Sequence, residues 1–191
     1  MYLFLDEEFA AQLQHGDKMA FEAIVHRYHE PIYAYIVRMG SEYHIAADIT
    51  QEVFLKVCKS IHQYKPDLPF RPWIYTIASN TYKDYLKKAY VQRDVPGLEI
   101  TDSIAVTEDT PETAFLENSE RAIVVEALKC LEEIYREVLI LRYYQDLKLE
   151  EIAQTLQIPI GTVKSRLSTA LHKMKTMLVK EEISNVKPAK R

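Results

Sequence analysis

Residues 149–175 read LEEIAQTLQIPIGTVKSRLSTALHKMK, and their apolar spacing predicts two helices joined by a tight turn. The first helix carries apolar residues from Leu149 to Leu156, the turn lies at QIPIG, and the second helix carries them from Val163 onwards. This pattern is typical of a helix-turn-helix, whose second helix enters the major groove of DNA. An ordinary helical hairpin is the alternative, but residues 161–180 contain five Lys or Arg and no acid, which favours a nucleic-acid partner.

The start of the second helix presents polar and basic side chains away from its apolar face. A recognition helix contacts base edges from this position. We therefore expect DNA contacts from Thr162, Lys164, Ser165, Arg166 and Ser168.

Charge is segregated along the 191 residues, although the net charge is only −4. Residues 70–93 hold five basic side chains against one acid, whereas residues 94–120 hold eight acids and no base. The acidic block also contains Pro96, Gly97 and Pro111, which predicts a flexible linker. With only 4 Gly in the chain, we predict an all-α fold of two small helical domains joined by that linker. The predicted boundaries are 1–93 for the first domain, 94–113 for the linker, 114–180 for the domain with the helix-turn-helix, and 181–191 for a tail.

Helical periodicity gives the elements within each domain. In the first domain it predicts a helix at 18–39, which Pro31 should kink or divide, and helices at about 45–61 and 71–89. In the second domain it predicts a helix at about 114–134, followed by shorter helices near 135–144, 149–157 and 160–180.

The helix at 45–61 has an unusual outer face. Opposite its apolar arc it presents Asp48, Gln51, Glu52 and Leu55 at spacings i, i+3, i+4 and i+7. Two carboxylates, an amide and an exposed Leu form either a docking surface for another protein or a solvated helix face. Spacing alone leaves both interpretations open.

The helix at 71–89 combines aromatic and cationic side chains. One side carries Tyr82 and Tyr85, which we expect in the core, and the other carries Trp73, Ile77 and Asn80. Rings next to amides and cations suit single-stranded nucleic acid, because bases stack on rings while Lys and Arg neutralise phosphate. Packing of Trp73 and Ile77 on the helix at 18–39 is the alternative.

Several other classes of protein find little support in the sequence. No apolar run approaches the roughly 20 residues of a membrane span, which predicts a cytoplasmic protein with no membrane insertion. Cys58 and Cys130 lie on apolar sides of helical patterns and are expected to be reduced core thiols. No catalytic arrangement stands out, so we expect a non-enzyme with no cofactor and no metal. A helical metalloenzyme is a rival hypothesis on one helix face that carries Glu22, His26, His29 and Glu30.

Three blocks resemble the extracytoplasmic-function group of bacterial sigma factors. AADITQEVFLKV (46–57) resembles the polymerase-binding segment, FRPWIYTIASNTYKDYLKK (70–88) the promoter-melting helix, and residues 135–174, from YREVLILRYYQ to LHKM, region four. They occur in the order and at the spacing of the family. One departure is Glu132, which replaces a Pro that the family usually has where the last helical segment opens.

The resemblance implies a function and partners. It implies that the face at Asp48, Gln51, Glu52 and Leu55 binds the β′ clamp helices of core RNA polymerase. It also implies a second contact, between this chain and the β subunit of the polymerase. It implies that residues 162–168 read the minus-thirty-five element, that the loop at 62–71 captures a flipped-out base, and that the linker follows the path of nascent RNA. It further implies promoter DNA and an anti-sigma factor as partners. The residues that it places at the minus-ten element are Phe70, Arg71, Trp73, Asn80, Lys83 and Lys87.

A stand-alone helix-turn-helix regulator remains the rival function. It would explain residues 114–180 but neither the polymerase-like face nor the aromatic helix. Such a regulator binds duplex DNA without polymerase, which distinguishes the two hypotheses.

Overall fold

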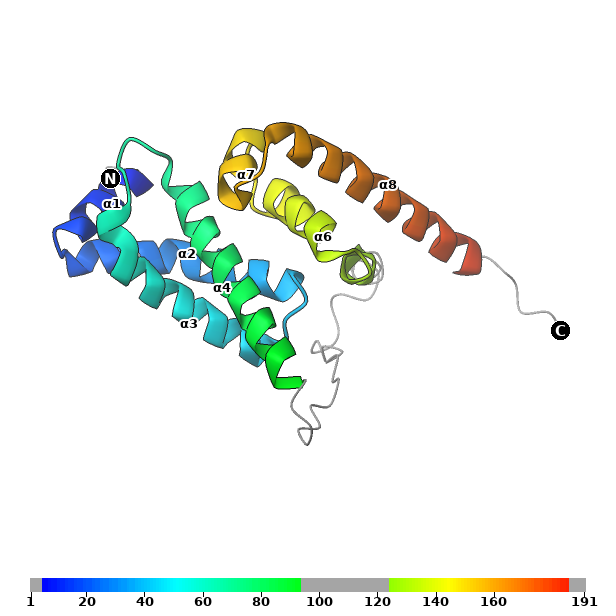
Figure 1. The fold of residues 1–191 in the computed structure, drawn as a ribbon, viewed down its shortest axis with the longest axis horizontal. Coiled ribbons are helices and arrows are strands. Elements are labelled where there is room, and N and C mark those ends of the chain that lie inside the picture. The colour runs from blue at the N-terminus through cyan, green and yellow to red at the C-terminus, as the bar shows by residue number, and fades with distance from the viewer. Residues whose placement is uncertain (1–4, 94–123, 186–191) are drawn as a thin grey trace, which may run out of the picture.

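The computed structural model describes residues 5–93 and 124–185, and this part of the chain is built of helices (Figure 1). The N-terminal unit consists of α1 (Asp6–Gln14), α2 (Lys18–Arg38), α3 (Tyr43–Ser60), the 3-10 helix η1 (Ile61–Gln63) and α4 (Phe70–Arg93). The C-terminal unit consists of the helical residues 124–129, α6 (Glu133–Leu139), the π-helical segment η2 (Ile140–Tyr144), α7 (Leu149–Leu156) and α8 (Ile160–Asn185). The described residues contain no strand, and the predicted all-α class is confirmed. None of the described helices is both long and apolar enough to span a membrane.

Helix α2 is continuous although it contains Pro31. It begins at a genuine N-cap, because the carboxylate of Asp17 accepts a hydrogen bond of 2.8 Å from the backbone N–H of Met19. A Pro inside a helix costs about 3 kcal/mol. Buried residues on both sides of Pro31, among them Tyr28 and Tyr35, stabilise α2 through its contacts with the core. Of the expected kink or division at Pro31, the division is wrong.

The chain breaks its helix at residues 130–132, earlier than the predicted end at 134. The guanidinium of Arg136 donates hydrogen bonds to the backbone carbonyls of Leu128, Lys129 and Leu131. These carbonyls lie at and just after the end of the helical residues 124–129, where backbone carbonyls have no partner in the next helical turn; that of Leu128 also accepts from the backbone N–H of Leu131. The break thus forms with Glu132 in place of a Pro, because a side chain from the next helix satisfies the preceding one. The rest of that predicted helix, 114–123, lies outside the described residues.

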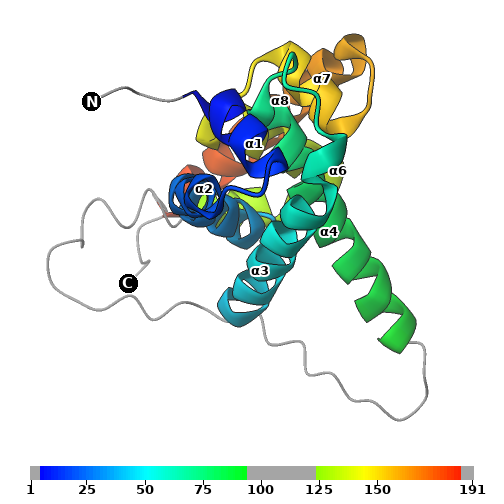
Figure 2. The same ribbon diagram turned by 90° about the vertical axis from the view of Figure 1, so that its left-hand side faces the viewer.

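The two units pack against each other and share one hydrophobic core. Buried residues from Ala10 to Met174 belong to a single cluster, in which α4 and α7 lie side by side. Figures 1 and 2 show the C-terminal unit lying along one side of α4, with α8 running outward. The linker predicted at 94–113 falls outside the described residues.

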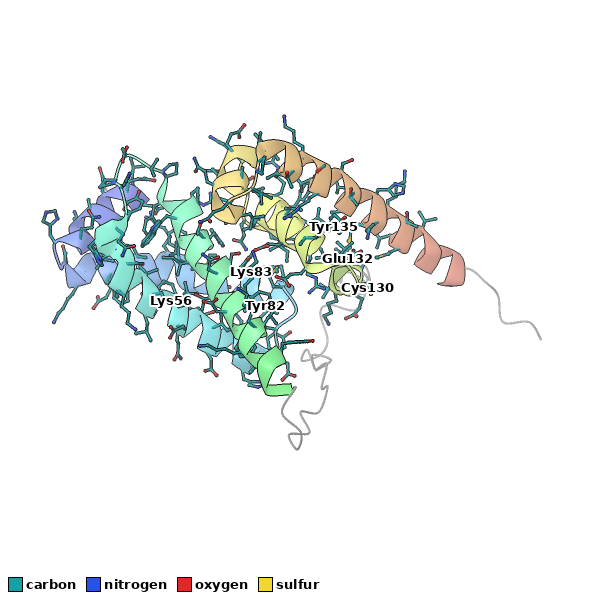
Figure 3. The ribbon with its side chains drawn as sticks, viewed as in Figure 1. Lys56, Tyr82, Lys83, Cys130, Glu132 and Tyr135 are labelled. Carbon is teal, nitrogen blue, oxygen red and sulfur yellow. The ribbon has the colours of Figure 1, made fainter. Side chains whose placement is uncertain are left out.

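Both cysteines are free and exposed, so their expected place in the core is wrong. Cys58 lies on α3, next to the buried Val57, and Cys130 lies at the helix break (Figure 3). The apolar pattern of each segment continues past its Cys, but no helix among residues 5–93 and 124–185 covers either position. One accessible thiol therefore marks each unit.

A first prediction concerns Gln157, which ends α7 in the left-handed conformation at φ 54°. Glycine adopts this conformation without the steric cost that a Cβ brings. We expect Gln157→Gly to raise the free energy of unfolding by up to about 1 kcal/mol, measured by thermal or denaturant unfolding. The matched control is Gln154→Gly inside α7, which should lower it by about 1 kcal/mol. A loss of stability in the Gln157 variant would contradict the prediction.

Candidate functional site

The outer face of α3 is open to solvent. Asp48, Gln51 and Glu52 are exposed, and the side chain of Leu55 is 54% exposed. In the described part of the chain none of these four side chains makes a hydrogen bond or an ion pair. The opposite side of α3 is buried, and Phe54 stacks there on His29 with ring centroids 6.2 Å apart. The face thus presents solvent-exposed polar groups around one exposed apolar side chain, a combination that suits contact with another protein.

Phe70 does not belong to the surface. Its side chain is fully buried, its backbone N–H donates to Glu7 at 3.0 Å, and its ring contacts those of Tyr64 and Trp73 at 5.4 Å each. We therefore remove Phe70 from the predicted DNA contacts. Trp73 is half-buried, because one side of its ring packs on this cluster. Phe70 and Tyr64 thus hold the indole in place at the edge of the core.

A hollow of about 340 Å³ lies between α3 and α4, and on α4 it is lined by residues one and two turns after Trp73. Asn80 and Ile77 form the side of α4, and Asn80 is exposed. The side of α3 and η1 is polar and basic, and sequence reasoning missed it. Its residues, Lys56, Lys59, Ser60 and Gln63, follow helical spacing, and this spacing is the signal that would have identified them. An apolar wall with amides and cations can accept a base and its phosphate.

The other predicted cations of α4 divide into two groups. Lys87 is exposed, as is Asn80 two turns earlier on the same face of α4. Arg71, in contrast, donates to the backbone carbonyl of Gln145, and Lys83 forms an ion pair of 3.0 Å with Glu137. Figure 3 shows Lys83 on the side of α4 that faces the C-terminal unit. Arg71 and Lys83 are therefore engaged by residues from the other end of the chain.

Glu137 is the centre of a buried polar cluster that the sequence did not predict. Its side chain is 2% exposed, and its carboxylate accepts hydrogen bonds from Tyr35 at 3.0 Å and Ser79 at 2.6 Å besides pairing with Lys83. Burial, reinforced by the charge of Glu137, raises the pKa of Tyr35 well above its ordinary value. The phenol thus stays protonated and remains a donor to the carboxylate.

The helix-turn-helix forms as predicted from α7 and α8. Val163, Leu167 and Ala170 of α8 are buried, and Ile152 of α7 lies in the same core. The five predicted DNA-contacting residues all reach the surface: Lys164, Ser165 and Ser168 are exposed, and Thr162 and Arg166 are half-buried. The start of α8 therefore presents a basic face that a DNA groove can reach.

The residues considered for a metal site do not form one. Glu22, His26, His29 and Glu30 are all exposed on α2. Among residues 5–93 and 124–185, no group of three or more His, Cys, Asp or Glu side chains is placed to hold an ion.

Comparison with known proteins identifies the family. Residues 24–90 match the model of sigma-70 region 2, and residues 127–176 match that of sigma-70 region 4. The RNA polymerase sigma-H factor of Pseudomonas aeruginosa is 33% identical over 174 residues, which cover 86% of this chain and 89% of that protein. The ECF RNA polymerase sigma factor SigW of Bacillus subtilis is 33% identical over 163 residues, covering 82% and 87%.

The chain belongs to the extracytoplasmic-function group of sigma-70 factors. As a sigma factor it directs RNA polymerase in promoter recognition, DNA melting and transcription initiation. Two solved structures share its fold, each at 23% identity. One is CnrH in complex with the cytosolic domain of CnrY, with a TM-score of 0.70 over 92% of this chain and 97% of that one. The other is the sigma factor RpoE in complex with the anti-sigma factor NepR from Bartonella quintana, with a TM-score of 0.69 over 83% of this chain and 96% of that one. The N-terminal unit thus contains region 2 of this sigma factor, and the C-terminal unit contains region 4.

The buried tyrosines of the sigma factor generate a second prediction. Burial raises the pKa of Tyr82 to about 12, and it also raises the pKa of Tyr28, Tyr35 and Tyr75. In the unfolded chain tyrosine ionises near pH 10, so the unfolded state loses these protons first. The stability that neutral phenols contribute is complete below about pH 10 and is lost as the pH rises through the folded pKa values. We expect the free energy of unfolding to fall steeply above about pH 10.

Denaturant unfolding across this pH range, with tyrosinate absorbance at 295 nm as a parallel readout, measures the effect. The variant Tyr82→Phe loses a hydrogen bond of 2.9 Å to the carbonyl of Met39 but should show a shallower pH slope. A slope that is equal in both proteins would contradict the assignment for Tyr82.

Proposed function

We propose that this sigma factor binds core RNA polymerase, at the β′ clamp helices, through the outer face of α3, with a further contact to the β subunit. The exposure of Asp48, Gln51, Glu52 and Leu55 together, on a helix whose opposite side is buried, is the observation that carries the proposal. Carboxylates on this face complement a basic partner, and Leu55 supplies an apolar contact at its centre.

Promoter DNA is the second proposed partner. The start of α8 would read the minus-thirty-five element as duplex through Thr162, Lys164, Ser165, Arg166 and Ser168. On α4, Trp73, Asn80 and Lys87 would hold the single strand of the minus-ten element, together with Arg71 and Lys83. The hollow beside Asn80 has the size and lining for one flipped-out base.

We also infer the cellular setting of the chain. Both fold neighbours named above were solved with a second protein, and one of these is called an anti-sigma factor. An anti-sigma factor is thus a proposed partner of this chain as well. The chain itself would act in the cytoplasm, where RNA polymerase is, and would carry out no catalysis of its own.

A third prediction tests the polymerase face. Gln51→Ala combined with Glu52→Ala should weaken binding to core polymerase by about tenfold, because both side chains point to solvent and leave the fold intact. A pull-down titration measures the affinity. Run-off transcription, from a promoter that the wild-type holoenzyme selects out of a random library, measures activity.

The matched control is Glu22→Ala with His26→Ala, two exposed positions on α2. It should bind and transcribe as the wild type does. Equal polymerase binding by both double variants would refute the α3 face. Tight duplex binding without polymerase, and no run-off product with it, would instead support a stand-alone regulator.

A fourth prediction separates the two DNA contacts. Arg166→Ala should weaken duplex recognition at the upstream element by roughly 1 to 3 kcal/mol. Lys175→Ala, exposed further along α8, is its control and should have a small effect. Asn80→Ala should leave the closed complex intact but reduce strand opening, because its proposed base leaves the stack only then. Permanganate reactivity of thymines separates the steps, and normal reactivity in the Asn80 variant would remove that residue from the site.

A further inference from the structure

The C-terminal unit covers a continuous side of the minus-ten helix α4. Pro72, Thr76, Ser79 and Lys83 follow one another at spacings of four, three and four residues, so they share one face of α4. Every one of them bonds to the C-terminal unit. Thr155 donates to the carbonyl of Pro72 at 3.3 Å, Thr76 donates to the carbonyl of Thr155 at 3.2 Å, and Ser79 and Lys83 both contact Glu137.

The Glu137 carboxylate gives Lys83 and Ser79 of α4 the same kind of acceptor that a DNA phosphate would give them. Carboxylate and phosphate oxygens accept the same hydrogen bonds from a Lys ammonium and a Ser hydroxyl. Both of these donors lie within 3.0 Å of the Glu137 carboxylate, so a DNA phosphate that takes over these bonds has to displace that carboxylate. Glu137 and DNA would therefore compete for Lys83.

Gln145 binds the second of these cations, Arg71. Its backbone carbonyl accepts from Arg71, its side-chain oxygen accepts from the phenol of Tyr75, and its side-chain amide donates to the carbonyl of Pro31 at 3.3 Å. Gln145 is buried between α2 and α4 by these contacts. Arg71 thus gives up its partner only when η2 leaves the N-terminal unit.

The polymerase face remains open in the same arrangement. Gln51, Glu52 and Leu55 are exposed on α3, and Lys164 and Ser165 are exposed at the start of α8. Region 4 therefore masks two of the cations proposed to hold the minus-ten strand, while both other proposed surfaces stay accessible.

We propose that this arrangement is a closed state in which the Glu137 carboxylate excludes DNA from Lys83, and that α6, η2 and α7 separate from α4 when the minus-ten strand binds. The inference rests on the proposed role of Lys83 and Arg71 in DNA binding. If only a small fraction of molecules is open, the apparent affinity for DNA is reduced by that fraction. Breaking the Glu137 contacts increases the open fraction and tightens DNA binding by the same factor.

The decisive variant is Glu137→Gln in the full-length chain. The amide keeps the size of the side chain but loses the charge that holds Lys83, Ser79 and Tyr35. Hydrogen bonds to charged groups are worth enough that we expect binding to a fluorescein-labelled oligothymidylate to tighten roughly tenfold to a hundredfold. Glu132→Gln is the matched control, because it makes the same change of net charge but breaks the pair with Lys173 inside region 4. It should leave the affinity within about twofold of the wild type.

Spin labels on Cys58 and Cys130 report the separation of the two units, because one exposed thiol lies in each. On titration with oligothymidylate, the distance between labels should lengthen in all proteins. The Glu137 variant should reach the longer distance at roughly tenfold to a hundredfold lower DNA concentration. Tyr35→Phe, which removes one buried donor to Glu137 and little volume, should shift in the same direction by a smaller factor.

Two results would overturn the closed state: equal oligothymidylate affinity in wild type and Glu137→Gln, or DNA binding with no change in label distance. Adding Lys83→Gln to the Glu137 variant should abolish the gain in affinity, and a gain that persists would also refute the competition. Failure of the proposed function is a separate observation, since a chain that produces no run-off transcript with core polymerase fails whatever the labels show.

Discussion

The Glu137 carboxylate is the group on which the arrangement of the two regions depends. Removing an ionised carboxylate from water costs several kcal/mol unless it is paired and hydrogen-bonded. Here α2 supplies Tyr35, and α4 supplies Ser79 and Lys83. Because three donors on two helices must reach one carboxylate, α6 is restricted to a single position against them. The apolar contacts around this cluster stabilise the packing of α6, but they do not determine its position.

Arg136, the neighbour of Glu137, attaches α6 to the residues before it and to the end of α2. Its guanidinium holds the turn before α6 and also donates to the carbonyl of Met39, at the end of α2. The next residue, Gly40, has φ 107°, and a Cβ there would lie 2.8 Å from Nη1 of Arg136. Glycine is needed both for the backbone conformation and for this approach. Two adjacent residues of opposite charge thus attach α6 to α2 and to α4.

Sequence periodicity correctly predicted the features that depend on one helix or on two helices adjacent in sequence. The open face of α3 and the turn between α7 and α8 are of this kind. It gave the wrong environment for Cys58, and the family resemblance gave the wrong one for Phe70. Neither indicated the role of Glu137, because these environments depend on segments distant in sequence. Spacing gives the angle of a side chain around its own helix, but not which angles a second layer covers. The sequence divided α4 into two faces, whereas packing against region 4 created a third, polar face, and the deciding partners lie about 60 to 80 residues away.

That third face also bears on how a chain of net charge −4 interacts with a polyanion, because it pairs Lys83 of α4 with a carboxylate of the protein itself. Free cations on α4 would bind any nucleic acid, since phosphate contacts carry no sequence information. In the closed state Lys83 is paired with Glu137, and in the proposed open state it is paired with phosphate, so its ammonium has an anionic partner in both states. Glu137, on opening, returns to water, where its charge is well solvated. Each side of the exchange therefore keeps its charges satisfied, and the balance between the states is small enough for polymerase and promoter to shift it.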